Sequence, residues 1–295
     1  MTINRRRAAS SKVSSDKKKD GHRNESVYAQ LIEGKVIKGT QKGDVRDQLD
    51  FLHSVKTGKK WQVFLYGHER ILDSKYLKIL EPCLDAFPLD SHLYFQDRIR
   101  CIEFKEDFIK KHGREAAREL SNSKVSKAIG NNEYVNSKNR LASATSLVRD
   151  QLKNRIFLRN FLAESLFNND EVSYLAVKDS TFLADDVYKT FDREDVLNIF
   201  SDAMFPEISQ AGNVPEDFNV AAQKTLLKYS PRESSSKNVV EIEIRNDSAT
   251  HYRQVRFNMY SKDALFLLIN GLKRFPIAKP VEGLELYGKA ASKQN

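Results

Sequence analysis

The chain has 295 residues, enough for one large domain or two smaller ones with a substantial core. Its 40% hydrophobic and 30% charged residues are typical of a globular protein, and the sequence has neither an apolar run as long as a membrane span nor a signal-peptide core. Its two cysteines, Cys83 and Cys101, indicate no disulfide framework and no zinc site, so we expect a cytoplasmic protein without membrane contact.

Positive charge is concentrated at the N-terminus. Residues 1–23 carry eight Lys or Arg against two Asp, which gives +6 of the net +9. This segment is rich in Ser and Lys and poor in large apolar residues, so we expect a disordered basic arm. Two interpretations remain equal: a solubilising tail, or an arm that follows the phosphates of a nucleic acid.

Structure is predicted to begin at Asn24. Residues 24–34 have apolar side chains at helical spacing and end in a glycine, which predicts a helix. Short segments with strand character follow, separated by Gly or polar residues, and predict successive strands between about residues 44 and 67.

The middle of the chain is predicted to be mainly helical. Helical patterns cover residues 74–87, 101–121 and 143–168, with a polar and basic connection over 121–140. Residues 171–179 resemble a strand, and 193–202 a short helix.

The C-terminal third is predicted to contain a β-hairpin and a helix. Residues 238–247 and 252–261 alternate in polarity and predict the hairpin, 219–231 fits a helix or a strand, and a helix is predicted from Ser261. No internal boundary is evident, so we expect a single domain over 24–288, with its core in about 24–70 and later elements, and a loose tail over 289–295.

One spacing in the strand-rich segment points to chemistry. Ser54 and Lys56 lie two residues apart on a predicted strand and so share a face, and Asp44 precedes a strand that can pair with it. Such a carboxylate and ammonium could flank one Mg²⁺ and one water, because Mg²⁺ prefers oxygen ligands and keeps several waters. Each residue alone has an ordinary explanation as a turn or a solvated surface group.

The segments "GKVIKGTQKGDV" and "SVKTGKKWQVFLY" resemble the PD-(D/E)XK nuclease superfamily, and more narrowly type II restriction endonucleases. The resemblance covers about residues 25–66. It implies an α/β, restriction-endonuclease-like core: a mixed β-sheet flanked by helices, here with helical and β-hairpin elaborations. It also implies Mg²⁺-dependent, sequence-specific hydrolysis of double-stranded DNA that leaves 5′-phosphate ends, without an organic cofactor, by a homodimer on a palindromic target.

The resemblance also implies roles for individual residues. Asp44 matches the aspartate that binds Mg²⁺, and Lys56 matches the lysine of the motif. Ser54 stands where the family usually has Asp or Glu, so Glu25 on the preceding helix is the candidate second carboxylate. Gln62 fits a polar residue that lines the site from the next strand.

Two segments are candidates for reading DNA, 121–140 and 240–260, because Lys and Arg suit phosphates or guanine and Asn suits adenine. An ordinary exposed surface remains an equal interpretation of the first. The candidate DNA-binding residues are Lys124, Lys127, Asn131, Asn132, Lys138, Arg140, Arg253 and Arg256.

Two other functions stay open. A non-catalytic DNA-binding protein could use the same basic surfaces, and Ser54 favours it slightly. A DNA-repair or transposition nuclease could share the fold, since fold does not determine function.

Overall fold

The computed structural model describes residues 19–37, 43–58, 60–118, 120, 122–179, 187–209, 224–232, 235–274 and 281–292. The N-terminal helix covers residues 19–31. The other helical elements are α2 (His68–Leu72), the 3₁₀ turn η1 (Leu77–Leu80), α3 (Glu81–Asp85), α4 (Ser91–Arg118), α5 (Asn122–Ile129), α6 (Glu133–Leu152), α7 (Arg155–Phe167), α8 (Arg193–Ala203), α9 (Ser261–Gly271) and α10 (Lys289–Ser292).

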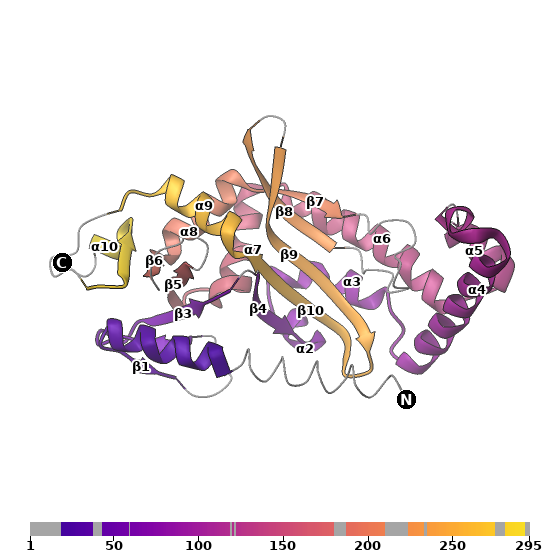
Figure 1. The fold of residues 1–295 in the computed structure, drawn as a ribbon, viewed down its shortest axis with the longest axis horizontal. Helices are drawn as coiled ribbons and strands as arrows, with labels where there is room; N and C mark the ends of the chain where they lie inside the picture. The colour runs from indigo at the N-terminus through magenta and orange to yellow at the C-terminus, as the bar shows by residue number, and fades with distance from the viewer. Residues whose placement is uncertain are drawn as a thin grey trace. The chain divides into compact units, whose positions relative to one another are not determined.

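The strands form two sheets (Figure 1). The six-stranded sheet has the order β1-β2-β3-β5-β6-β11, and the five-stranded sheet the order β4-β10-β9-β8-β7. The strands are β1 (Lys35–Val36), β2 (Val45–Arg46), β3 (Leu52–Lys56), β4 (Lys60–Tyr66), β5 (Val172–Asp179), β6 (Val187–Asp192), β7 (Phe205–Ser209), β8 (Lys224–Arg232), β9 (Ser235–Ser248), β10 (His251–Tyr260) and β11 (Leu284–Tyr287).

Contacts divide the chain into two compact units, each assembled from separate segments. Unit 1 comprises residues 1–61, 162–202 and 260–295, and unit 2 comprises 62–161 and 203–259. The sequence predicted one domain without an internal boundary. Composition does not reveal such a division, because the segments of each unit are separated in the sequence by segments of the other.

Unit 1 is built on the six-stranded sheet, which is mixed. β1, β2 and β3 are antiparallel neighbours, β3 pairs parallel with β5, β5 antiparallel with β6, and β6 parallel with β11. The N-terminal helix packs through Tyr28 and Ala29 on a cluster that includes Val45, Val55 and Ala176 of this sheet. The predicted class, a mixed sheet with flanking helices, is confirmed at this level.

Gly34 ends the N-terminal helix, as predicted. Its amide donates to the carbonyl of Ala29 at 2.7 Å. A Cβ at this position would lie 2.6 Å from the carbonyl oxygen of Arg46, so only glycine fits between the helix and β2. The chain can therefore enter β1 directly after the helix.

Unit 2 combines the five-stranded sheet with helices α2 to α6. The β7–β8, β8–β9 and β9–β10 pairs are antiparallel, and the predicted hairpin is confirmed as β9 and β10. Residues 224–232, left open between helix and strand, form a strand because they pair with β9.

Several predicted elements differ in the structure. Within the predicted connection 121–140, residues 122–129 form α5 and residues 133–140 begin α6. The helix predicted over 143–168 is two helices, α6 and α7. The predicted loose tail begins with α10, where the amide of Lys289 donates to Asp195 Oδ2 at 2.7 Å and Ala290 is buried. None of the helices in the described ranges combines the length and apolar character that a membrane span needs.

Candidate functional site

Asp44 is fixed by the backbone immediately before β2. Its amide donates to the carbonyl of His53 at 2.8 Å, and its carbonyl accepts from the amide of Ile37 at 3.0 Å. A Cβ at Gly43 would lie 3.0 Å from Leu52 Cβ, so glycine at this position lets the chain approach β3 closely. The carboxylate of Asp44 is thereby directed at residues 54–56 of β3.

The side chains of Asp44, Ser54 and Lys56 converge, as the sequence predicted. Asp44 Oδ2 accepts from the amide of Val55 at 2.7 Å, from Lys56 Nζ at 3.2 Å and from Ser54 Oγ at 3.4 Å. The second oxygen, Oδ1, accepts no hydrogen bond from any described residue. The side chains of Asp44 and Lys56 are 23% and 14% exposed, so this pair is accessible to a ligand.

Ser54 and Lys56 share one face of β3, and their neighbours share the other. Val55 lies in the core under the N-terminal helix, and His53 is hydrogen-bonded to Tyr28 of that helix. The strand alternation that predicted this arrangement is confirmed.

Glu25 lies on the N-terminal helix, which covers the Val55 face of the sheet. Its Oε2 lies 3.0 Å from His22 Nδ1 of the same helix, and its side chain is 18% exposed. Among the described residues, Glu25 makes no hydrogen bond or ion pair with Asp44. Among the residues that the structure describes, no three His, Cys, Asp or Glu side chains gather as a metal-binding group.

Gln62 lies on β4, and β4 does not pair with β3. In the sheet of Asp44 and Lys56, β3 is flanked by β2 and β5, whereas β4 belongs to the five-stranded sheet. The side chain of Gln62 lies outside the described residues. The strand predicted to carry Gln62 is present as β4, but the chain leaves the sheet of Asp44 after Lys56, so β4 does not lie beside β3.

A buried hydrogen-bond chain behind the site was not predicted. His53 Nε2 donates to Asp47 Oδ2 at 3.2 Å. The hydroxyl of Tyr28 is hydrogen-bonded to His53 Nδ1 and to Thr190 Oγ1, both at 2.9 Å. Burial acts to raise the pKa of Asp47, but the hydrogen bonds from His53 and the Phe51 amide outweigh it and lower that pKa. These hydrogen bonds connect the β2–β3 turn to the N-terminal helix. Their only signal in the sequence is a histidine on the inner face of a predicted strand.

The oxygen atoms of Asp44 and Ser54 are ligands of the type that Mg²⁺ prefers. Mg²⁺ commonly takes one or two protein carboxylates and completes its shell with waters and substrate phosphate oxygens. Asp44 Oδ1 is an accessible carboxylate oxygen without a hydrogen bond from the described residues, and Ser54 supplies a neutral oxygen 3.4 Å from Oδ2. One carboxylate and one hydroxyl are hard ligands, as this ion prefers.

Most of the candidate DNA-binding residues have structural contacts in unit 2. Asn132 caps α6 and is 1% exposed, and Asn131 accepts from Asn136 at 2.8 Å. Lys138 is 6% exposed. The three arginines bind carboxylates: Arg140 to Glu133, Arg253 to Asp85 and Arg256 to Glu243.

Two of the candidate lysines are exposed. Lys124 and Lys127 lie on α5, which carries no acidic residue in its sequence Asn122–Ile129. They therefore fit the predicted phosphate-contacting role better than Lys138 does.

Comparison of the chain with protein-family models, with curated proteins and with solved structures found no match. The case for a function therefore depends on the geometry described above and on the residues of the motif.

Proposed function

We propose that this chain is a Mg²⁺-dependent endonuclease that hydrolyses double-stranded DNA. The observation that supports the proposal is the convergence of Asp44, Ser54 and Lys56 on one accessible carboxylate, at the spacing that resembles restriction endonucleases. A basic chain with a net charge of +9 suits a polyanionic substrate.

Each residue would have a distinct role. Asp44 would hold the ion through Oδ1, and waters and substrate phosphate oxygens would complete its shell, because Glu25 bonds to His22 on the helix that covers the opposite face of β3. The bound ion would supply charge neutralisation at the phosphate and a more acidic water. Lys56 would orient the attacking water and stabilise the charge that develops on the phosphate oxygens. Ser54 and the Val55 amide would keep the Asp44 carboxylate in one rotamer by hydrogen bonding to Oδ2.

The reaction adds one water across a P–O3′ bond. The water oxygen attacks phosphorus in line with the departing 3′ oxygen, and the products are a 5′-phosphate and a 3′-hydroxyl. A homodimer on a palindromic site would place one such centre on each strand.

The test is cleavage of supercoiled plasmid by the purified full-length chain with Mg²⁺, with Mn²⁺ and with EDTA. Asp44→Asn keeps the size of the side chain and removes its charge, and Lys56→Ala removes the ammonium. Lys35→Ala, an exposed lysine on β1 of the same sheet, is the matched control.

We expect the parent and Lys35→Ala to nick and linearise the plasmid with Mg²⁺. Asp44→Asn and Lys56→Ala should be at least about 100-fold slower, the range expected when one positioned group in proton transfer or charge stabilisation is lost. Equal rates for the two site variants and the parent would show that the site is misassigned. If the parent cuts the plasmid, sequencing the cut ends distinguishes a restriction enzyme from a repair or transposition nuclease with weak sequence preference.

A second candidate is a DNA-binding protein without cleavage. Ser54 in place of a carboxylate favours it, since Asp44 is then the one acidic group among the three converging side chains. Salt-dependent DNA binding by the parent, with no cleavage in Mg²⁺ or Mn²⁺, would select this candidate.

A further inference from the structure

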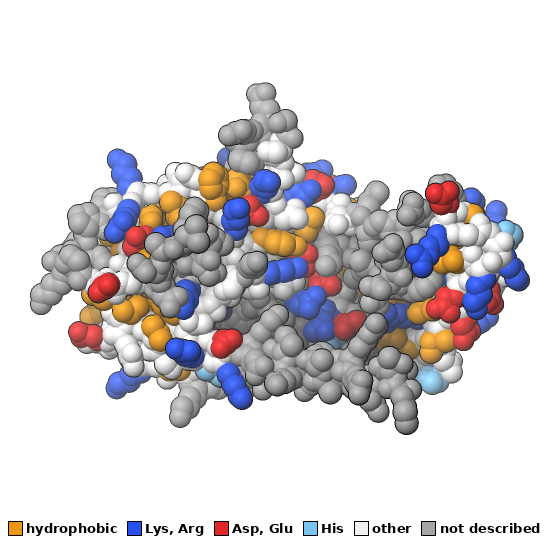
Figure 2. Space-filling view, viewed as in Figure 1, with side chains coloured by type: hydrophobic (Ala, Val, Ile, Leu, Met, Phe, Trp, Pro, Cys, Tyr) orange, Lys and Arg blue, Asp and Glu red, His pale blue; other side chains and the backbone are white. Residues whose placement is uncertain are grey.

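The β9–β10 hairpin of unit 2 has one apolar face and one polar face. Ile242, Ile244, Val255 and Phe257 are buried on the apolar face. The strand register places Gln254 opposite Arg245 and Arg256 opposite Glu243 on the other face. Figure 2 shows Lys and Arg side chains with Asp and Glu among them over the strands β9 and β10.

A β-bulge at Arg253 determines which side chains reach the polar face. Arg253 has a φ of 52° and no partner in the register, which passes from Tyr252 opposite Asn246 to Gln254 opposite Arg245. Residues two apart on a regular strand share a face, so without the bulge Tyr252 and Gln254 would point the same way. With it, Tyr252 packs against Phe87 and Tyr94 while Gln254 joins the polar face.

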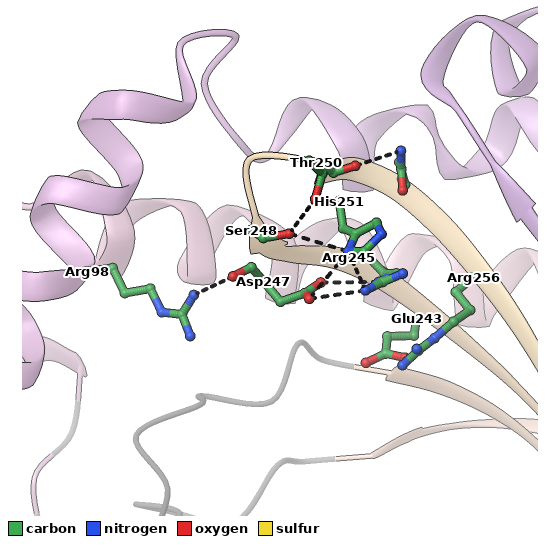
Figure 3. A network of polar contacts seen from close by, with 9 residues as sticks. Arg98, Glu243, Arg245, Asp247, Ser248, Thr250, His251 and Arg256 are labelled. Atoms are coloured by element: carbon green, nitrogen blue, oxygen red, sulfur yellow. Dashed lines mark hydrogen bonds and ion pairs between the residues drawn. The ribbon is translucent and has the colours of Figure 1, made fainter. Parts of the chain in front are cut away.

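The two arginines of this face are held by carboxylates along one edge. Arg245 donates through Nε and Nη2 to the two carboxylate oxygens of Asp247, both at 3.1 Å (Figure 3). Arg256 donates through Nε and Nη2 to Glu243. In both side chains Nη1 donates to no described residue. Arg245 Nη2 also donates to His251 Nδ1 at 2.8 Å, so Arg245 keeps only the two N–H groups of Nη1 for a ligand. Arg256 keeps those of Nη1 and one of Nη2, and both guanidinium groups are fixed in orientation.

Gln254 contributes an unsatisfied amide to the same face. Its Oε1 is enclosed and has no hydrogen-bond partner in the described part of the chain, and its Nε2 lies 3.4 Å from the carbonyl of Thr250. An enclosed acceptor without a donor destabilises the protein. Because the side chain as a whole is partly exposed, rotation of its amide onto a ligand would relieve that cost.

The polar network further along the hairpin is closed. Asn258 Nδ2 donates to Glu241 Oε1 at 3.0 Å, and both side chains are buried. The unsatisfied groups are therefore confined to the end of the hairpin that carries Arg245 and Gln254.

The end of the hairpin extends beyond β8 on the β9 side, while β10 has β4 as its other neighbour in the sheet. β8 pairs with β9 only as far as Glu243, so the hairpin continues beyond β8 (Figure 1). The connection between α3 and α4, and α4 itself, hold the end of the hairpin from one side: the hydroxyl of Tyr252 donates to the carbonyl of Pro88 at 2.9 Å, and Arg98 of α4 donates to the carbonyl of Asp247 at 3.2 Å. No residue of β8 pairs with β9 beyond Glu243, and a β-hairpin that projects in this way can enter the major groove of B-DNA.

We propose that the polar face of the β9–β10 hairpin binds base edges in the major groove of double-stranded DNA and determines which sequence the protein recognises. The inference rests on the proposed function only in taking DNA as the ligand. Arg256 keeps adjacent Nη1 and Nη2 donors that match guanine O6 and N7, Arg245 can donate a single hydrogen bond to a base through Nη1, and Gln254 has the donor and acceptor for adenine N6 and N7. The carboxylates that hold the arginines leave the face with little net charge, which suits base edges better than phosphates.

The test separates binding from cleavage. The full-length chain is incubated with a pool of randomised DNA duplexes in Ca²⁺ without Mg²⁺, and the bound duplexes are sequenced. Gln254→Ala removes the amide and Arg256→Lys keeps the charge but removes the planar donor pair. Lys237→Ala, an exposed lysine on β9 away from this face, is the control, and thermal melts verify that each variant is folded.

We expect the parent and Lys237→Ala to enrich the same sequence. Gln254→Ala should lose its preference for adenine at one base pair, and Arg256→Lys for guanine at another, by about tenfold or more each. The same enriched sequence in all four proteins would overturn the inference while leaving the proposed function intact. A parent that cuts the plasmid but enriches no sequence would also overturn the inference and leave the proposed function intact. A parent that neither binds nor cuts DNA would overturn both the inference and the proposed function.

Discussion

At the scale of single residues, the two oxygens of the Asp44 carboxylate have different roles. Asp44 Oδ2 accepts from Ser54, Val55 and Lys56, which fixes the carboxylate, and Oδ1 is left for a ligand. Ser54 is 2% exposed, so its contribution is a hydrogen bond and not a charge. Any second negative charge near the ion must therefore come from elsewhere.

Ser54→Asp should make the protein less stable without metal and more responsive to it. A carboxylate at this buried position would face Asp44 Oδ2, now 3.4 Å from Ser54 Oγ, and like charges so close destabilise each other. We expect the free energy of unfolding to fall by about 1–3 kcal/mol without metal. Mg²⁺ should restore more stability than it gives the parent, because two carboxylates bind the ion more tightly than one.

Chemical denaturation with and without Mg²⁺ would measure both effects. Ser54→Asn, of similar size but uncharged, should be destabilised without recovering in Mg²⁺. Equal recovery of Ser54→Asp and Ser54→Asn would contradict the placement of an ion beside Asp44.

At the scale of helices and strands, the sequence predicted elements better than it predicted their partners. Alternation of polarity identified the β9–β10 hairpin, and short runs of strand-forming residues identified β3 and β5, although residues 52–55 and 174–177 are buried on both faces of the sheet. The helices over 122–140 were missed, since their Asn and Lys content is typical of loops. Asn132 is there for a structural reason: it caps α6 by accepting from the amide of Val135 at 3.1 Å.

Asn132→Ala should therefore reduce stability and leave DNA binding unchanged. The cap to Val135 is lost, and so is the bond from Asn132 Nδ2 to the carbonyl of Asp97 at 3.1 Å. We expect a loss of about 1–2 kcal/mol in urea denaturation. Asn131→Ala, at an exposed neighbour, should change stability by less than about 0.5 kcal/mol. Weaker DNA binding by the folded Asn132 variant would contradict its assignment as a cap.

Lys138 makes the packing of α6 sensitive to pH. Burial, together with repulsion from Arg98 and Lys105, lowers the pKa of Lys138 to about 7. The folded protein thus releases this proton near pH 7, whereas the unfolded chain keeps it up to about pH 10.5. The unfolded state binds more protons between these values, so this group makes stability rise with pH over that range.

Lys138→Met should raise the melting temperature, because it removes the cost of burying an ammonium. The gain should be largest below pH 7 and should shrink towards pH 10, where the lysine of the parent is already neutral in the folded state. Melting curves at pH 6, 8 and 10 would measure it. A gain that is the same at all three values would show that the lysine stays charged in the folded protein.

At the scale of the whole molecule, charge is distributed unequally between the N-terminal arm and the rest of the chain. Residues 1–23 carry +6 of the net +9, and the first 18 residues lie outside the described part. Replacing Arg5, Arg6 and Arg7 by Gln distinguishes a phosphate-binding arm from a solubilising tail without shortening the chain.

If the arm contacts phosphates, the slope of log K against log salt for DNA binding should fall by up to about 2.7 in the triple variant, at about 0.9 for each contact. A charge-matched control replaces Lys110, Lys111 and Lys153, three exposed lysines of unit 2, by Gln. An unchanged slope in the arginine variant would leave the solubilising tail as the interpretation.

The sequence carries less information about architecture at this scale. Asp44 and Lys56 could be assigned because a spacing on one strand fixes the face that two side chains share. The assignment of β4 to another sheet depends on pairing with a strand almost two hundred residues later, and the bulge at Arg253 depends on contacts with α3. Local patterns do not encode such distant partners.

The division of the chain between the two units constrains the order in which a growing polypeptide can fold. Unit 2 ends at Met259, whereas unit 1 still requires residues 260–295, which supply α9 and the edge strand β11. During synthesis the hairpin unit is complete before the sheet that carries Asp44 and Lys56 can close. A ribosome-bound chain of which residues 1–260 have left the exit tunnel would thus present a finished hairpin unit while the sheet around Lys56 still lacked its last strand.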